Sequence, residues 1–156
     1  MKLTVTKQEN SYLLILSYEV PSSLENSWSL LATNQGFARW FPQLRIEGEK
    51  LVFEMEDFRE YMDLLAYRLH KMVAYTWDTA SVSFSLNRHE QGTQIFFVEE
   101  IPVNFGNEFA NARKDMTGWL VQNDCIKALL NDKELPDRSV LREKWAAMLE
   151  SELEGI

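Results

Sequence analysis

The stretch that decides the fold is residues 73–100, VAYTWDTASVSFSLNRHEQGTQIFFVEE. Within it, large apolar residues alternate with small or polar residues over 73–77 and again over 82–86. A two-residue period of this kind is typical of a strand that buries one face. The polar segment 87–92 predicts a hairpin turn, and 93–99 predicts a third strand. The apolar face of this antiparallel sheet needs a cover from elsewhere in the chain.

Composition excludes several classes of protein. The chain has 156 residues, so we expect one domain over 1–156, and 46% of the residues are hydrophobic, which excludes a disordered protein. The net charge of -8, without a run of Lys or Arg, disfavours nucleic acid and anionic membranes as partners. No stretch reaches the roughly 18 apolar residues of a membrane span.

Cysteine usage and the first residues point to the cytoplasm. Cys125 is the only cysteine, so the chain can form neither an internal disulfide nor a thiolate metal site. The N-terminus has an early Lys2 but lacks the apolar core of a signal peptide. We therefore expect a cytoplasmic protein in a reducing compartment.

The N-terminal part predicts an edge strand followed by two short helices. Residues 3–19 alternate with one interruption, and we expect one long, irregular edge region here and not two well-formed strands. Ser22 or Ser23 then caps a helix that ends at 34–36. A second short helical turn follows at 37–41 and stops before a proline.

The remaining chain predicts further strands and two long helices. Segments 44–46, 51–56 and 60–69 are short strands, which brings the antiparallel sheet to six or seven strands. Residues 104–131 form the longest helical pattern, and its apolar stripe is the natural cover for the sheet. Residues 137–154 predict a final helix that Asp137 caps.

The final helix carries an apolar stripe that water cannot favourably cover. The stripe consists of Leu141, Trp145, Met148, Leu149 and Leu153. Burial of one such side chain contributes roughly 1.5–3 kcal/mol. The helix therefore folds back on its own domain or meets the same surface of a second copy, so the chain is a monomer or a homodimer through this helix.

Several local motifs, in this order, resemble a known superfamily. They are Trp28, Thr33 and Trp40 within VPSSLENSWSLLATNQGFARWFP, the Trp-ended strand 73–77 with its partner 82–86, Gly92-Thr93, and Gly118-Trp119. Over residues 12–131 the chain resembles the START-related, birch-pollen-allergen-like helix-grip superfamily (SRPBCC). Within it, the similarity is greatest to the activators of the heat-shock-protein-90 ATPase. The final helix extends beyond the pattern of that family.

The resemblance implies an α+β helix-grip fold. In that fold a curved antiparallel sheet wraps around a long C-terminal helix, and two short helices follow the first strand. A cavity between sheet and helix is common in it, so aromatic residues either pack as a plain core or line a cavity, and both alternatives are open. The candidate cavity-lining residues are Trp28, Trp40, Phe53, Met55, Tyr75, Trp77, Phe84, Phe96, Phe109, Met116 and Trp119. The polar candidates at the same surface are Tyr61, Tyr75, Arg113 and Asn123.

Other chemistry has weak support. The acidic residues Glu54, Glu56, Asp57, Glu60 and Asp63 surround a hairpin, where a solvated outer face is favoured over a metal site. We expect the same solvated setting for Glu99-Glu100. His70 and His89 belong to different strands, and the chain lacks the HExxH, P-loop and GxSxG motifs. We therefore expect no metal, no cofactor and no catalytic residues.

Three functions follow from these observations. The leading hypothesis is a non-enzymatic binding protein that holds a small hydrophobic ligand between sheet and long helix. The second is a co-chaperone or stress-related protein-binding module, with a chaperone as partner, which rests on the resemblance and the acidic surface. The third is a polyketide cyclase-like or hydratase-like enzyme that uses His70, Tyr61 and Glu56.

Overall fold

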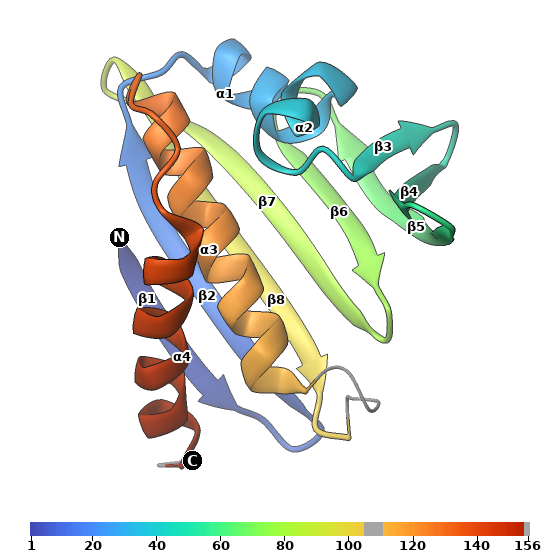
Figure 1. The fold of residues 1–156 in the computed structure, drawn as a ribbon. Helices are drawn as coiled ribbons and strands as arrows, with labels where there is room; N and C mark the ends of the chain where they lie inside the picture. The colour runs from blue at the N-terminus through green and yellow to red at the C-terminus, as the bar shows by residue number, and fades with distance from the viewer. Residues whose placement is uncertain (105–110, 155–156) are drawn as a thin grey trace.

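The computed structural model of the protein describes residues 1–104 and 111–154. These residues form an α+β structure in which four helices lie against one antiparallel sheet of eight strands (Figure 1). The strands are β1 (Lys2–Lys7), β2 (Ser11–Val20), β3 (Leu44–Glu47), β4 (Lys50–Met55), β5 (Phe58–Arg68), β6 (Met72–Trp77), β7 (Ala80–His89) and β8 (Gly92–Pro102). The helices are α1 (Leu24–Ala32), α2 (Asn34–Trp40), α3 (Ala112–Leu130) and α4 (Arg138–Glu154).

The sheet has the order β1-β2-β8-β7-β6-β5-β4-β3. All its neighbours pair antiparallel, and the strands from β3 to β8 follow one another as a meander. The β1–β2 hairpin joins the meander because β2 pairs with the last strand, β8. Figure 1 shows α3 lying along one face of this sheet, which we call the inner face. The architecture matches the helix-grip arrangement expected from the sequence.

The expected edge region over residues 3–19 is wrong, and this accounts for the higher strand count. The segment forms two regular strands in continuous register, from Lys2 opposite Ser17 to Lys7 opposite Tyr12. A backbone hydrogen bond of 2.8 Å from Gln8 N to Ser11 O closes the turn between them. The polar interruption in the alternation is therefore a hairpin turn and not an irregularity within one strand.

Two caps fix the short helices at the end of the sheet. The Ser23 hydroxyl accepts a hydrogen bond of 3.1 Å from Asn26 N and caps α1, as expected. The Thr33 side chain caps α2, so this helix begins at Asn34, three residues before the predicted turn. A Cβ atom on Gly36 would lie 2.1 Å from Ser29 O, so only glycine permits this close approach of the two helices.

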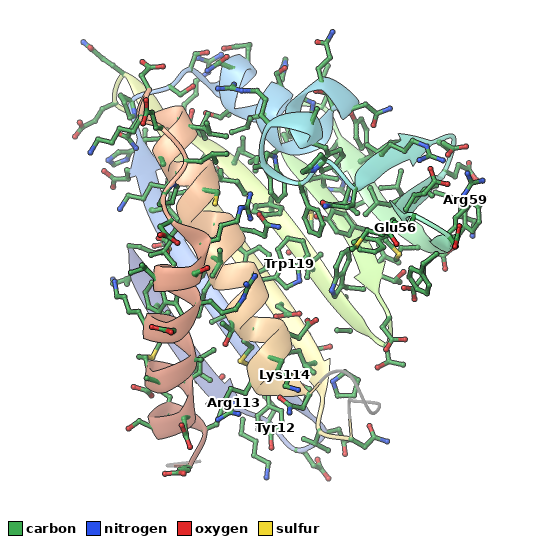
Figure 2. The ribbon with its side chains drawn as sticks, viewed as in Figure 1. Tyr12, Glu56, Arg59, Arg113, Lys114 and Trp119 are labelled. Carbon is green, nitrogen blue, oxygen red and sulfur yellow. The ribbon has the colours of Figure 1, made fainter. Side chains whose placement is uncertain are left out.

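Trp119 of α3 is the centre of the aromatic packing between helix and sheet. Its ring centroid lies 5.1 Å from that of Trp77, 5.3 Å from that of Phe97 and 6.2 Å from that of Phe84. Trp119 is only 2% exposed. Offset and edge contacts of this kind stabilise the fold beyond the area that they bury. They dock α3 on the middle of the sheet (Figure 2).

The final helix packs against its own domain. Leu149 of α4 is fully buried, and the side chains of Leu141, Trp145 and Met148 pack against the same core. The indole nitrogen of Trp145 donates a hydrogen bond of 2.6 Å to Asp124 of α3. This is the first of the two arrangements expected from the apolar stripe. The homodimer through this helix stays a prediction.

Truncation of Leu149 tests this docking. We expect Leu149→Ala to lower the free energy of unfolding by about 2–5 kcal/mol, because it leaves a cavity between α4 and the core. Val140 lies on the same helix and is 61% exposed, so Val140→Ala is a matched control with an expected change within about 0.5 kcal/mol. Urea unfolding of both variants measures the difference. Equal effects would mean that α4 is not docked in solution.

Candidate functional site: an aromatic pocket beside two buried carboxyls

A pocket of about 220 Å³ opens between α3, the first residues of α4 and the aromatic end of β6. Its lining comprises Phe41, Trp77, Lys114, Asp115, Gly118, Trp119, Val121, Gln122, Arg138 and Arg142. The centroid of the Trp77 ring lies 5.7 Å from that of Phe41 and 5.1 Å from that of Trp119, so three rings form a continuous apolar wall. The pocket thus has aromatic walls and charged groups at its borders.

Local sequence explains why this space is open. Trp77 is the last residue of β6, and Phe41 is the C-cap residue of α2, so each ring lies at the end of its element. Both side chains are only half-buried. On α3, Gly118 presents no side chain, and a Cβ atom placed there would have no heavy atom within 4 Å among its non-neighbours. A glycine in the middle of a helix is unfavourable, and here it leaves the pocket unfilled.

Basic residues surround the outer side of the pocket. The Arg138 guanidinium donates to Gln122 Oε1 at 2.9 Å and to the Trp40 carbonyl at 2.8 Å, so its position is fixed. Lys114 and Arg142 also line the pocket, and both side chains are exposed. Figure 2 shows Lys114 near the start of α3, on the same helix as Trp119. Three cationic groups at one small pocket are notable in a chain of net charge -8.

Two carboxyl groups meet at the inner side of the pocket. Glu99 of β8 is fully buried on the inner face of the sheet, between Leu14 of β2 and Val82 of β7 in register. Asp115, in the first turn of α3, lines the pocket and faces Glu99 within hydrogen-bonding reach. The Trp77 indole donates a hydrogen bond of 3.2 Å to Asp115 Oδ1.

The solvated setting expected for Glu99 is therefore wrong. Ile95, Phe97, Glu99 and Ile101 alternate along β8 and are all buried on the inner face. Glu99 occupies a position in this series that the strand period assigns to the core. Glu100, its neighbour on the opposite face, is exposed as expected. The sequence did contain a signal for this burial, because Glu99 lies two residues after Phe97 and so shares its face of the strand. The prediction followed the acidic character of Glu99-Glu100 and not this spacing.

Burial controls the protonation of the two carboxyls. It raises the pKa of Glu99 well above the usual range, and the neighbouring Asp115 raises that pKa further. Burial also raises the pKa of Asp115, although hydrogen bonds from Glu99 and Trp77 oppose this effect. Like charges in a shared dry site cannot both ionise easily. Burial beside Asp115 therefore favours the protonated form of Glu99, whose proton faces the Asp115 carboxylate.

Three acceptor atoms at this position lack a conventional hydrogen-bond donor. Within residues 1–104 and 111–154, both carboxyl oxygens of Glu99 and Asp115 Oδ2 are buried without a partner other than the shared proton. The hydroxyl group of Tyr75, also on the inner face, is buried without a partner. Its pKa is raised by burial and by the nearby Glu99. The site thus combines an apolar wall with unsatisfied polar atoms.

The structure divides the residues expected to line a cavity into four groups. Trp77 and Trp119 line the pocket, and Phe53 touches its wall, with its ring centroid 6.1 Å from that of Trp77. Five others are buried in the filled core, namely Trp28, Trp40, Tyr75, Phe84 and Met116. Two do not lie between sheet and α3, and these are Met55 and Phe96. Phe109 lies outside the described residues.

The two misplaced residues have simple physical causes. Met55 is 51% exposed because it lies at the end of β4, at the tip of the β4–β5 hairpin and beyond the cover of the helices. Phe96 lies on the outer face of β8, since the neighbouring Phe97 occupies the inner face and is fully buried. In a pair of adjacent phenylalanines, only one ring can point inward from a strand.

The polar candidates are also divided. Asn123 is buried, where it accepts a hydrogen bond of 2.8 Å from the Tyr18 hydroxyl and donates one of 2.9 Å to the Trp119 carbonyl. It is therefore a satisfied core residue. Tyr61 is 55% exposed on the β4–β5 hairpin, and Arg113 forms an ion pair of 3.5 Å with Glu150 of α4. Neither Tyr61 nor Arg113 lines the aromatic pocket.

The residues of the enzymatic alternative do not converge. Glu56 lies in the turn of the β4–β5 hairpin (Figure 2), whereas His70 follows the other end of β5 and contacts Trp28. Seven residue steps of strand separate Tyr61 from Arg68 at the end of β5, a distance of about 23 Å at 3.3 Å per residue, and His70 lies in the turn beyond. Burial also raises the pKa of the Cys125 thiol, which opposes formation of a nucleophilic thiolate. Within the described residues, no three His, Cys, Asp or Glu side chains are grouped to hold a metal.

Comparisons with known proteins agree on the fold. No family model matches the chain, and no curated protein matches it. A conserved protein of unknown function from Enterococcus faecalis is 23% identical, with a TM-score of 0.81 over 96% of this chain and 91% of that one. CalU16 from Micromonospora echinospora is 12% identical, with a TM-score of 0.69 over 96% and 94% of the two chains. The Aha1 dimer from Colwellia psychrerythraea is 18% identical, with a TM-score of 0.61 over 76% and 96%.

These similarities support the helix-grip fold that the sequence motifs indicated. At such identities they establish the shared fold alone, and they do not single out the activator family. A helix-grip fold is compatible with a binding function. In the described parts of the chain, none of the helices has the length and hydropathy needed to cross a membrane.

Replacement of Glu99 tests the protonated pair. An unfolded Glu ionises above about pH 4.3, whereas folded Glu99 keeps its proton to a higher pH. The contribution of this pair to stability is therefore fully present below the unfolded pKa and is lost as the pH rises towards the folded pKa. Glu99→Gln cannot ionise and still donates to Asp115. As the pH rises from 5 to 8, the free energy of unfolding of Glu99→Gln should fall less than that of the wild type. The difference should be about 1.4 kcal/mol for each unit by which the fold raises the pKa of Glu99.

Chemical denaturation of both proteins across this pH range measures the effect. Glu100→Gln is the matched control, because Glu100 is the exposed neighbour on the opposite face of β8. The titratable groups around Glu99 are Asp115, Tyr75 and, through Asp115, Asp78, and all of them stay in both variants. Parallel curves for the wild type and Glu99→Gln would show that Glu99 is ionised in the native protein.

Proposed function

We propose that the protein is a non-enzymatic binding protein that holds a small hydrophobic ligand between the sheet and α3. The observation that carries this proposal is the aromatic wall of Phe41, Trp77 and Trp119 around an open space of about 220 Å³. Pockets that bind small molecules are mostly apolar, with a few placed polar groups. Gly118 also supports the proposed binding function, since a larger residue there would close the pocket.

The filled core limits the size of the ligand. The rings of Trp40, Phe84 and Phe97 are fully buried against one another or against Trp119, so the ligand does not extend along the whole of α3. Pockets for drug-sized molecules measure about 300–1,000 Å³, and the pocket of about 220 Å³ is smaller. The proposed ligand therefore has one aromatic ring, or two fused rings, with short substituents.

A protein-binding role is the second candidate, and one observation favours it. Met55 and Phe58 pair across the β4–β5 hairpin and are 51% and 55% exposed. Exposed apolar side chains that adjoin one another are typical of interaction sites. The similarity to Aha1 makes a chaperone of the heat-shock-protein-90 class the first partner to test. Met55→Ser with Phe58→Ser should abolish that binding, and absence of binding by the wild-type protein would exclude this role.

Filling the pocket tests the leading proposal. A library of one- and two-ring aromatic compounds should raise the Tm of the wild-type protein and quench its tryptophan fluorescence. We expect Gly118→Leu to abolish both effects, because the leucine side chain occupies the open space. The variant itself should be no less stable than the wild type, since leucine favours a helix by up to about 1 kcal/mol over glycine.

Gly118→Ala is the matched control for this experiment. Its added Cβ meets no heavy atom within 4 Å among its non-neighbours, so it improves the helix while leaving room for a ligand. This variant should keep the ligand effects. Unchanged ligand binding by a folded Gly118→Leu protein would show that ligands bind elsewhere, and the proposal would then be abandoned.

A further inference from the structure

The pocket has a polar inner end whose acceptors are unmatched. Asp115 lines the pocket with a buried Oδ2 whose only donor in the described part of the chain is the proton shared with Glu99, so this oxygen keeps a free lone pair, while Trp77 donates to Oδ1. Behind Asp115, both oxygens of the fully buried Glu99 have no partner beyond the shared proton. Acceptors buried without a donor are unfavourable, so their presence beside an open space points to a donor that a ligand brings.

The charges around the pocket favour a neutral donor. Lys114, Arg138 and Arg142 all line it, and a cationic ligand would approach Asp115 past these three positive groups. A hydroxyl group has no such repulsion, and it satisfies one acceptor without taking the proton held between the two carboxyls. An aromatic hydroxyl fits both the walls and the inner end, because the ring that carries it packs against Trp77 and Trp119.

The outer end of the pocket fits an acid. Lys114 and Arg142 form no ion pair within residues 1–104 and 111–154, although the protein carries an excess of carboxylates. Arg138 is fixed beside them by its bonds to Gln122 and Trp40. Arginine and lysine near an apolar wall are suited to the carboxylate of a ligand that is otherwise buried.

We propose that the pocket selects a hydroxyaryl acid, whose hydroxyl group donates to Asp115, whose ring packs against the wall formed by Trp77 and Trp119, and whose carboxylate meets Arg142 and Lys114. This assignment rests on the proposed function, since it names the ligand class of the same pocket. Such a ligand would contact the acceptor oxygen of Asp115, the aromatic wall and the basic residues at the outer end of the pocket.

Three small probes separate the parts of this proposal. 4-Hydroxyphenylacetate carries both polar groups, phenylacetate lacks the hydroxyl group, and p-cresol lacks the carboxylate. Calorimetric titration should show that 4-hydroxyphenylacetate binds at least about tenfold more tightly than each of the other two. Asp115→Asn should reduce the preference over phenylacetate towards onefold. Arg142→Gln should reduce the preference over p-cresol in the same way.

A control variant outside the pocket and two separate outcomes distinguish failure of the ligand assignment from failure of the proposed function. Lys133→Gln removes an exposed cation outside the pocket lining and should change neither preference. Arg142 is also exposed, so its variant keeps the fold and stays informative if Asp115→Asn does not fold. Equal binding of all three probes, lost in Gly118→Leu, would overturn the hydroxyaryl acid and retain the proposed function. If neither the three probes nor any compound of the aromatic library binds, both the hydroxyaryl acid and the proposed function are wrong.

Discussion

The docking of Trp119 against the sheet is the interaction on which the rest of the structure depends. Its ring contacts Tyr75 and Trp77 of β6, Phe84 of β7 and Phe97 of β8, and thereby ties one helix to three neighbouring strands. Each partner lies on the inner face because the strand period places it there. The position of α3, and with it every group that α3 contributes to the pocket, follows from this contact.

The same docking creates a contrast along α3. Towards its C-terminal end the interior is filled by apolar side chains and by the satisfied pair of Tyr18 and Asn123. Towards its N-terminal end, Gly118 leaves space, and Asp115 is carried into contact with the buried Glu99. A fold built only for stability would favour an apolar residue at position 99, because burying an acid costs free energy. The retained acid is therefore the feature that most strongly suggests a function at this end.

Much of the fold could be predicted from sequence because it rests on local patterns. The alternation in β6, β7 and β8, the Ser23 cap and the apolar stripe of α4 each predict their elements directly. The predictions for Phe96 and for residues 3–19 failed because they depend on which strand face points inward and on which strands pair. Phe96 and Phe97 are equal in composition, and only the register with β2 and β7 decides which ring is buried. The hairpin of β1 and β2 likewise depends on pairing that no single strand pattern reveals.

The candidate site was predicted only in part for the same reason. Trp77 and Trp119 were identified as aromatic residues that turn towards one interior, and they line the pocket. Glu99 lies near the end of β8 and Asp115 near the start of α3, so the two residues belong to different elements. They come together only because α3 docks across the sheet. Gly118 was noted as part of a Gly-Trp motif, but its open surroundings become visible only in three dimensions.

Docking of α3 encloses the carboxyl groups of Glu99 and Asp115 beside the pocket, where burial favours a proton on Glu99. Carbon-13 NMR of the Glu99 carboxyl group, in protein labelled at glutamate and assigned with Glu99→Gln, tests it most directly. We expect the chemical shift of a protonated carboxyl at pH 7, with a titration midpoint well above the usual value for Glu. An ionised Glu99 at pH 7 that titrates like an exposed glutamate would contradict a proton held by the buried carboxyl pair.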